Sequence, residues 1–345
     1  MKATVRPDRD DHHHALRVLA GLLVPMSVLL LIGRPELLVY AVFGSFAGMY
    51  GRRVSGRPRI VRQVQAAGLL TVGVAIGVTL AHVGAPVWVL VIVETVYALV
   101  CSLAADVARL RPAGPFFFIF ALGATATVPP DLVAPPLAVA ICGATAVLAV
   151  GIGMIGVPHP LDGKPWLTGM RWLLRTPPSG VRVHAVRYAL AVGVAGTIGT
   201  VLGFDHANWA MAAAAVPLAA IDGTRPGDAT TRAVLVRAGH RTLGTFAGLL
   251  IAAVLLAFEP GAAVVAAVAV LLLWPTELFM SRHYAVAIGF FTPLIMLMTE
   301  LTAPAPPLEM LTLRGVDTLI GVAVGVAVAV MIPAGTGRRK ATGRD

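Results

Sequence analysis

The chain has 345 residues, of which 57% are hydrophobic and only 13% are charged, with a mean hydropathy of +0.84. A water-soluble domain of this length needs more charged surface than this composition supplies, so the composition excludes an ordinary soluble protein and indicates a polytopic membrane protein. The formal net charge of +10 does not indicate nucleic-acid binding, because the basic residues fall in short segments between apolar runs, where they would face anionic lipid headgroups.

Twelve apolar runs follow one another along the chain, most of them close to the ~20 residues that a helix needs to cross ~30 Å of hydrocarbon. These runs predict an all-α membrane protein with twelve transmembrane helices. The predicted helices lie at 15–32, 37–50, 64–82, 86–105, 113–128, 133–156, 184–203, 207–221, 241–258, 260–280, 283–301 and 314–333.

The basic residues predict the orientation of these helices. If the N-terminus is cytoplasmic, 25 of the 27 Lys and Arg residues lie on the cytoplasmic side, and only Arg34 and Arg314 lie outside. A bias of this size orients membrane proteins through the positive-inside rule. We therefore expect both termini in the cytoplasm. The excess of Arg over Lys is typical of a GC-rich genome and favours a bacterial plasma membrane.

The first six runs resemble the second six at an offset of about 170 residues, which pairs Ala15, Arg17 and Gly33 with Ala185, Arg187 and Gly203. Because each half has an even number of helices, the halves share one orientation and form a parallel repeat around an axis along the membrane normal. We expect a ligand path along that axis. The predicted parts are a first six-helix repeat, a cytoplasmic linker with or without a short amphipathic helix, a second repeat and a cytoplasmic tail, at 1–156, 157–183, 184–333 and 334–345.

The second and fifth helices of each half are short or contain proline. Pro217 lies in one second helix, and the fifth helices are flanked or interrupted by Pro115, by Pro129 with Pro130, and by Pro293. Broken segments at matching positions of two repeats indicate a substrate site, because freed backbone groups are tolerated only where a cavity satisfies them. The alternative is that Gly and Pro are simply frequent in membrane helices.

Glu94 lies near the middle of the fourth predicted helix. A carboxylate at that depth costs at least ~2.5 kcal/mol, so an intramembrane acid is a functional candidate by default. We assign Glu94 to proton coupling. The alternative is a permanently protonated side chain that is hydrogen-bonded to a neighbouring helix.

Arg241 opens the ninth predicted helix at the inner face, and Gly244 and Gly248 follow it at a spacing that permits close helix packing. We expect the two glycines to serve packing. Arg241 is a candidate for meeting an organic anion that enters from the cytoplasm, and the alternative is an ordinary positive-inside anchor.

At the outer end of the twelfth predicted helix, Arg314 and Asp317 are three residues apart and share one helix face, and the packing residue Gly321 follows. We expect Arg314 to pair in part with Asp317. Arg314 is also a candidate for binding a departing carboxylate, with Asp317 beside it on the substrate path.

Aromatic side chains follow a helical spacing in the second helix and crowd the fifth, and we place Tyr40, Phe43 and Phe291 along the substrate path. Such rings stack on aromatic ligands, although packing or lipid contact produces the same pattern. No Gly-rich phosphate loop, His-Glu metal motif or nucleophile elbow is present in the sequence. We therefore expect no enzyme, no metal site and no cofactor.

These features together resemble the fusaric acid resistance (FUSC) family of aromatic acid exporters, whose members carry an integral membrane bound transporter domain. The stretch from Arg241 to Gly248 is similar to the family's Arg-x-x-Gly-Thr-x-x-Gly helix start. The stretch from Arg314 to Gly321 is similar to the Arg-x-x-Asp-x-x-x-Gly opening of the last helix in each family domain.

The first half departs from the family pattern, because Gln65 or Arg62 stands near the Arg241 position and Arg314 has no equivalent. The large cytoplasmic region of many relatives is also missing from the sequence. The resemblance implies proton-driven efflux of organic, in particular aromatic, carboxylates, with membrane lipids as partners, no nucleic acid, and a homo-oligomer left open. The rival hypotheses are a passive anion channel, a membrane scaffold without a transported ligand, and an enzyme acting on lipid-linked phosphates.

Overall fold

The computed structural model describes residues 7–52, 54, 56–155, 179–203, 207–221 and 231–332. Within these ranges the regular structure is helical throughout and contains no strand, which confirms the predicted all-α class. The predicted tail and nearly all of the predicted linker lie outside the described residues, so the amphipathic helix in the linker stays a prediction.

Helical structure occupies each of the twelve predicted positions within the described ranges. The second position is a run of three short pieces, η1, α2 and η2. Eight of the helices are long and apolar enough to cross a membrane, namely α1, α3, α4, α6, α10, α11, α12 and α13. That all twelve positions cross it stays a prediction. The bounds are α1 Arg9–Leu31, η1 Pro35–Leu37, α2 Leu38–Ser45, η2 Phe46–Met49, α3 Arg57–His82, α4 Val87–Ala108, α5 Phe116–Ala126, α6 Pro135–Met154, α8 Ser179–Val201, α9 Ala207–Leu218, α10 Thr231–Ala257, α11 Ala262–Met280, α12 Tyr284–Thr302 and α13 Pro307–Met331.

Several helices begin well before their predicted starts, and in α10 and α13 this corrects the placement of a candidate residue. α10 begins at Thr231 and α13 at Pro307, so Arg241 and Arg314 lie ten and seven residues inside their helices. At 1.5 Å per residue these offsets are about 15 Å and about 10 Å. Hydropathy locates the apolar part of a helix. Helical turns that carry charged residues at its end are therefore not predicted from hydropathy.

Proline bounds the predicted fifth helix of the first half but does not break that of the second. α5 starts directly after Pro115 and ends before Pro129. α12, in contrast, runs without interruption through Pro293, so the predicted break there is wrong. A proline inside a membrane helix removes one backbone donor, which neighbouring helices tolerate.

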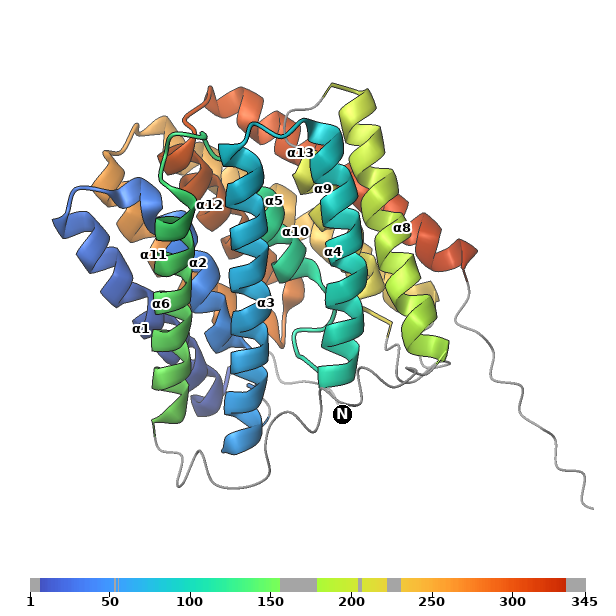
Figure 1. Ribbon diagram of the computed structural model, residues 1–345, viewed down its shortest axis with the longest axis horizontal. Coiled ribbons are helices and arrows are strands. Elements are labelled where there is room, and N and C mark those ends of the chain that lie inside the picture. The colour runs from blue at the N-terminus through green and yellow to red at the C-terminus, as the bar shows by residue number, and fades with distance from the viewer. Residues whose placement is uncertain are drawn as a thin grey trace, which may run out of the picture.

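The short helices form the interior of the bundle, and the long helices surround them. All eight residues of α2 and all twelve of α9 are buried. In Figure 1, α6, α3, α4 and α8 run along the near face with α2, α5 and α9 behind them. The outer helices present large apolar side chains such as Leu23, Val72 and Leu250 to the surroundings, as a lipid-facing surface requires.

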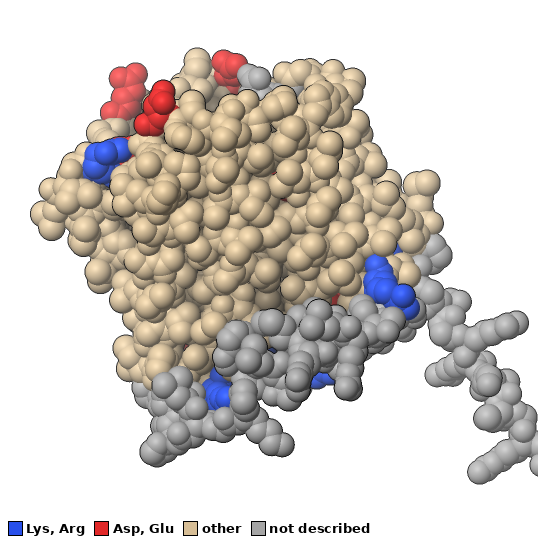
Figure 2. Space-filling view, in the orientation of Figure 1, with Lys and Arg blue, Asp and Glu red and all other residues tan. Residues whose placement is uncertain are grey.

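The two ends of the bundle carry opposite charge. Figure 2 shows a wide middle zone with few charged side chains, acidic groups along the upper end and basic groups mainly along the lower end. At the acidic end, helices of the described chain are joined by loops, and the charged residues in these loops and the adjoining turns include Arg34, Glu36, Asp131, Glu259, Glu300 and Glu309. The bundle is therefore polarised along the helix direction.

An ion cluster ties the basic end together. Asp8 and Asp11 form a capping box at the start of α1. Arg52 donates to the Asp11 carboxylate at 2.5 Å and to the Glu277 backbone carbonyl at 2.8 Å. Arg282, between α11 and α12, donates to both aspartates. One helix start thus links three parts of the chain that are far apart in sequence.

Candidate functional site

Two arginines lie in the interior of the bundle without a hydrogen-bonded acceptor. Arg241 on α10 and Arg314 on α13 are 0% exposed. None of their guanidinium nitrogens has a hydrogen-bond partner in the described part of the chain. Burial of a single cation costs several kcal/mol unless an anion or dipole compensates it. The protein therefore holds two cations whose desolvation its described hydrogen-bond acceptors do not offset.

Aromatic rings lie against both arginines, and Tyr284 near Arg241 and Asp317 near Arg314 are their polar neighbours. The Arg241 Cζ lies 5.0 Å from the Phe116 ring centroid, and the Arg314 Cζ lies 5.9 Å from that of Phe120 and 5.1 Å from that of Trp209. Phe116 and Phe120 stack on each other at 5.7 Å with an interplanar angle of 6°. One pair of stacked rings on α5 therefore joins the surroundings of both arginines, and the rings' negative faces offset part of the burial cost.

Further rings complete a cluster at the centre of the bundle. Phe291 from α12 contacts Phe116, Phe117 and Phe120 at centroid distances of 6.2, 6.0 and 5.9 Å. Phe43 from α2 contacts Phe120 at 5.7 Å. Two of the three rings predicted for the path, Phe43 and Phe291, thus belong to one cluster, which we call the ring cluster.

A narrow cavity lies on the acidic side of the ring cluster. It measures about 30 Å³, which accommodates little more than a single water molecule. Phe43, Phe120 and Trp209 line its inner part, and Thr127 and Ala303 line it at the ends of α5 and α12. The ring cluster and the arginines are thus nearly closed off from the acidic end.

On the basic side, a wider space leads toward the same rings. A cavity of about 340 Å³ is lined by Arg52, Arg111, Arg237 and Glu277. A small cavity of about 20 Å³ shares Arg237 with it and reaches Phe116. The Arg237 Cζ lies 3.4 Å from the centroid of the Tyr284 ring. Cationic side chains therefore mark the approach from the basic end to the ring cluster.

Glu94 lies in a second buried polar group, next to the ring cluster helices. It is 0% exposed on α4, and neither carboxylate oxygen has a hydrogen-bond partner among the described residues. A Cβ atom on Gly123 of α5 would come within 2.9 Å of the Glu94 Oε2 and 2.7 Å of the Asn208 Cβ. Glycine is thus required at position 123 to let Glu94 and Asn208 approach α5. The side-chain amide of Asn208 also has no hydrogen-bond partner among the described residues. Nothing in the sequence pointed to Asn208, because an amide carries no charge.

The remaining predicted path residues are buried but less connected. Asp317 is 0% exposed, and its carboxylate makes no hydrogen bond with Arg314 or with any other described residue, so the predicted pairing is not formed as a hydrogen bond. Tyr40 is also fully buried and lines neither cavity beside the ring cluster, and its hydroxyl has no hydrogen-bond partner among the described residues. The structure thus gathers the two arginines, Phe43 and Phe291, and leaves Tyr40 outside this group.

The candidate packing glycines lie at helix contacts. A Cβ on Gly248 would approach the Thr292 Cβ to 2.6 Å, and one on Gly244 would approach the Ile288 Cβ to 2.8 Å, both on α12. Gly321 meets α9, where its added Cβ would lie 2.7 Å from the Ala213 Cβ. These positions admit no side chain without movement of the neighbouring helix.

Gly73 and Gly77 of α3 lie against α5 as Gly244 and Gly248 of α10 lie against α12. Their added Cβ atoms would contact the Phe118 backbone carbonyl at 3.0 Å and the Thr125 hydroxyl. Each glycine precedes its second-half counterpart by 171 residues. At the same offset Leu70, and neither Gln65 nor Arg62 as predicted, stands at the position of Arg241, so the glycine pair keeps its spacing without the arginine.

Comparison with known proteins identifies the second half of the chain. A family model described as "Fusaric acid resistance protein-like" matches residues 194–328. This segment is therefore similar to the fusaric acid resistance protein-like family. The predicted family resemblance is thereby confirmed. The matched segment contains Arg241, Arg314 and Asp317, whereas Glu94 and the α5 rings lie outside it.

A curated relative is similar to part of the chain. The "Uncharacterized membrane protein YvaC" of Bacillus subtilis (strain 168) is 32% identical over 145 residues, which are 41% of this chain and 22% of that protein. The chain thus covers about a fifth of that relative's length. No solved structure matches the chain. With the apolar helices, the family match makes this a multi-pass membrane protein.

Proposed function

We propose that the protein is a secondary membrane transporter that exports organic carboxylates, in particular aromatic ones, in exchange for protons. The observation that carries the proposal is the pair of buried arginines, Arg241 and Arg314, which lack a hydrogen-bonded acceptor among the described residues and lie against aromatic rings. An aromatic carboxylate offers both the missing acceptor and a matching apolar surface.

Binding follows from the geometry of guanidinium groups. Arginine donates two parallel hydrogen bonds to a carboxylate, and hydrogen bonds to a charged group contribute ~1.5–3 kcal/mol each. Phe116 and Phe120 are available for stacking beside both cations. The substrate would therefore lie between α5, α10 and α13 and displace part of the ring cluster's present packing.

The cavities favour a transporter over a passive channel. An open channel needs a continuous pore, but the described cavities end on both sides of the ring cluster. The wide cavity of about 340 Å³ lies at the basic end, whereas the acidic side has about 30 Å³. We assign the structure to a state in which the substrate approach from the basic end is wider and the ring cluster is closed.

Proton exchange is assigned to Glu94. Its carboxylate is buried without a hydrogen bond in the described chain, and it lies against Gly123 of α5 and Asn208 of α9. These helices also carry Phe120 and Trp209, which contact Arg314. A change of protonation at Glu94 would act on the helices that hold the site.

The two halves are proposed to be parallel repeats, and equivalent helix contacts support this. α2 packs on α6 as α9 packs on α13, α3 on α5 as α10 on α12, and α4 on α8 as α11 on α1. Phe120 and Phe291, which are 171 residues apart, touch at 5.9 Å. Such contacts near a repeat axis are where a transporter binds its substrate.

The membrane orientation is likewise a proposal. Basic side chains gather at one end of the described bundle and acidic ones at the other (Figure 2). By the positive-inside rule the basic end faces the cytoplasm of a bacterial plasma membrane, and both termini lie there. Export is then movement from the wide cavity toward the acidic end.

Proteoliposome flux tests this function. Benzoate and its non-aromatic match cyclohexanecarboxylate are supplied with and without an imposed pH gradient, for the parent, Glu94→Gln and Arg241→Gln. We expect uphill movement of benzoate that needs the gradient, loss of coupling but retained benzoate exchange in Glu94→Gln, and little flux in Arg241→Gln. Arg232→Gln removes an exposed charge from the same helix and should transport as the parent does.

Three results would count against the proposal. Benzoate flux that ignores the gradient in the parent would indicate a passive channel. No flux of any carboxylate would favour a scaffold. Equal loss in Arg241→Gln and Arg232→Gln would mean that general surface charge, not the buried cation, is what matters.

A further inference from the structure

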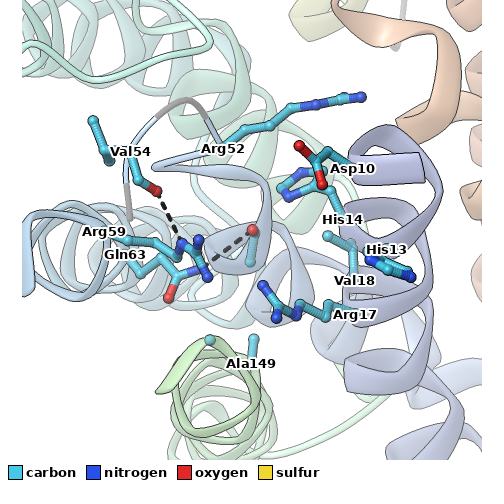
Figure 3. A pocket seen from close by; sticks show the side chains of 12 residues that line it. Asp10, His13, His14, Arg17, Val18, Arg52, Val54, Arg59, Gln63 and Ala149 are labelled. Carbon is cyan, nitrogen blue, oxygen red and sulfur yellow. Dashed lines mark hydrogen bonds between the residues drawn. The ribbon is translucent and has the colours of Figure 1, made fainter. Parts of the chain in front are cut away.

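A second cavity at the basic end adjoins the cavity of about 340 Å³, with which it shares His14 and Arg52 as lining residues. It has a volume of about 460 Å³, within the ~300–1,000 Å³ of typical ligand sites. Its walls come from α1, η2, α3 and α6, and it does not include the ring cluster. Figure 3 shows Arg17 from α1 and Arg59 from α3 extending into it from opposite sides, with Gln63 beside Arg59.

Two of the arginines that line this cavity have free hydrogen-bond donors toward the described residues. Arg17 makes no hydrogen bond or ion pair with the described residues, and Arg59 uses its Nε to donate to the Val54 carbonyl at 3.1 Å. Arg52, which also lines the cavity, is occupied by Asp11. Asp10 is the one carboxylate among the described lining residues. Two guanidinium groups therefore face one space with a single opposing acid, which favours an anionic ligand.

A buried acceptor adds a second element of recognition. Gln63 is 3% exposed, and its Nε2 donates to the Gly48 carbonyl at 3.3 Å. Its Oε1 has no hydrogen-bond partner in the described structure. That oxygen needs a donor such as a hydroxyl group or an ordered water. The cavity thus offers two cations and, beside them, an acceptor.

The surroundings of the cavity are apolar. Val18 and Ala149 form part of its wall, and Leu16 of α1 and Val64 of α3 nearby are about half exposed, at 51% and 45%. A ligand whose charged part fills the cavity could extend apolar groups along these helices. Basic pockets between membrane helices at the cytoplasmic side are suited to lipid headgroups.

We propose that this cavity is a phosphate-binding site, occupied by a phosphate group that Arg17 and Arg59 hold together, with Gln63 accepting from a neighbouring hydroxyl. The phosphate belongs to an anionic phospholipid headgroup or is free in solution. In either case the ligand joins α1 to α3, two helices whose cations otherwise repel each other across the cavity.

Native mass spectrometry of the detergent-solubilised protein tests the site. Phosphatidylglycerol is titrated, with phosphatidylcholine as the zwitterionic comparison. We expect the Arg17→Gln/Arg59→Gln variant to weaken phosphatidylglycerol binding by at least about tenfold, the equivalent of one lost charge-assisted hydrogen bond. The matched variant Arg9→Gln/Arg62→Gln removes the same charge from the same two helices outside the cavity and should change it by less than about twofold.

A variant that is expected to strengthen binding controls for misfolding, because a misfolded protein would not bind more tightly. Asp10 is exposed, so Asp10→Asn should leave the fold intact and strengthen binding by removing the acid from the cavity. A second arm adds inorganic phosphate and follows thermal stability. Stabilisation that the double variant loses, without selective lipid binding, would assign the site to soluble phosphate.

The proposal is overturned by either of two results. Equal weakening by the cavity pair and the matched pair would show general charge attraction to the lipid. No selective retention of phosphatidylglycerol together with no stabilisation by phosphate would show that the cavity holds no phosphate group.

Discussion

Two pairs of arginines in this protein have opposite surroundings. Arg52 and Arg282, at the basic end, are 15% and 21% exposed and both donate to Asp11. Arg241 and Arg314, at the centre, are 0% exposed and donate to no described acceptor. The more buried pair is thus the less satisfied, although its charges cost more to bury.

This difference indicates that the peripheral arginines stabilise the fold, whereas the central arginines are available to bind a ligand. In the peripheral cluster, hydrogen bonds within the protein offset the desolvation of the charges, because Asp8 and Asp11 each accept from an arginine. The central pair has ring contacts, and Asp317 and Tyr284 lie near it, but the described residues give its guanidinium groups no hydrogen bond. Unsatisfied buried groups persist where a ligand completes them, so the central pair should matter more for transport than for stability.

Neutralising the central pair is expected to have the largest effect. Arg241→Gln and Arg314→Gln should each lower benzoate flux in proteoliposomes by about 10- to 100-fold, because each removes charge-assisted hydrogen bonds worth ~1.5–3 kcal/mol. Their free energy of unfolding in detergent should not fall, since a buried unpaired charge is removed. A large loss of stability in both variants would show that these arginines hold the fold.

Removing an acid from the peripheral cluster should give the reverse outcome. Asp11→Asn weakens the contacts to Arg52 and Arg282 and half of the capping box, and should lower the free energy of unfolding by about 2 kcal/mol. Chemical denaturation in detergent measures this. Asp10→Asn, the exposed neighbour, is the control for loss of an acid in the first turn. If Asp11→Asn abolished benzoate flux without lowering the free energy of unfolding, the peripheral cluster would serve transport, and the contrast between the two arginine pairs would be wrong.

The sequence predicted where the helices lie but not which charges would be buried. Hydrophobic runs near the length of a span locate a helix through one local property, so helical structure occupies all twelve positions. The position of Arg241 depends instead on Phe116, which is 125 residues away in sequence. Placing Arg241 at the inner opening of its helix was therefore wrong, although the family resemblance of the segment that contains it is confirmed.

Other misses have the same physical origin. The predicted break at Pro293 failed because backbone tolerance depends on neighbouring helices, which a single sequence does not reveal. Asn208 was overlooked because its importance comes from Glu94 across Gly123. The pair Gly73 and Gly77, by contrast, could have been found from its spacing alone.

The α10–α12 contact tests whether the central pair depends on close packing. Gly248→Ala places a Cβ 2.6 Å from that of Thr292 and should lower the free energy of unfolding by at least about 1 kcal/mol. Gly239→Ala on the same helix meets nothing within 4 Å and should be neutral or stabilising. If detergent denaturation gave both variants the same stability, α10 would not be held against α12 by this contact.

Arg34 at the acidic end provides the weakest expected effect and completes the comparison. Its side chain is 45% exposed, pairs with Glu36 two residues away, and donates to the Leu132 carbonyl at 3.0 Å. Exposed pairs of this kind contribute ~0–1 kcal/mol, so Arg34→Gln should change the free energy of unfolding by less than about 0.5 kcal/mol. Flux should also stay near that of the parent. A strong loss of flux in Arg34→Gln at normal stability would mean that anion attraction at the exit, rather than binding at Arg241 and Arg314, limits transport.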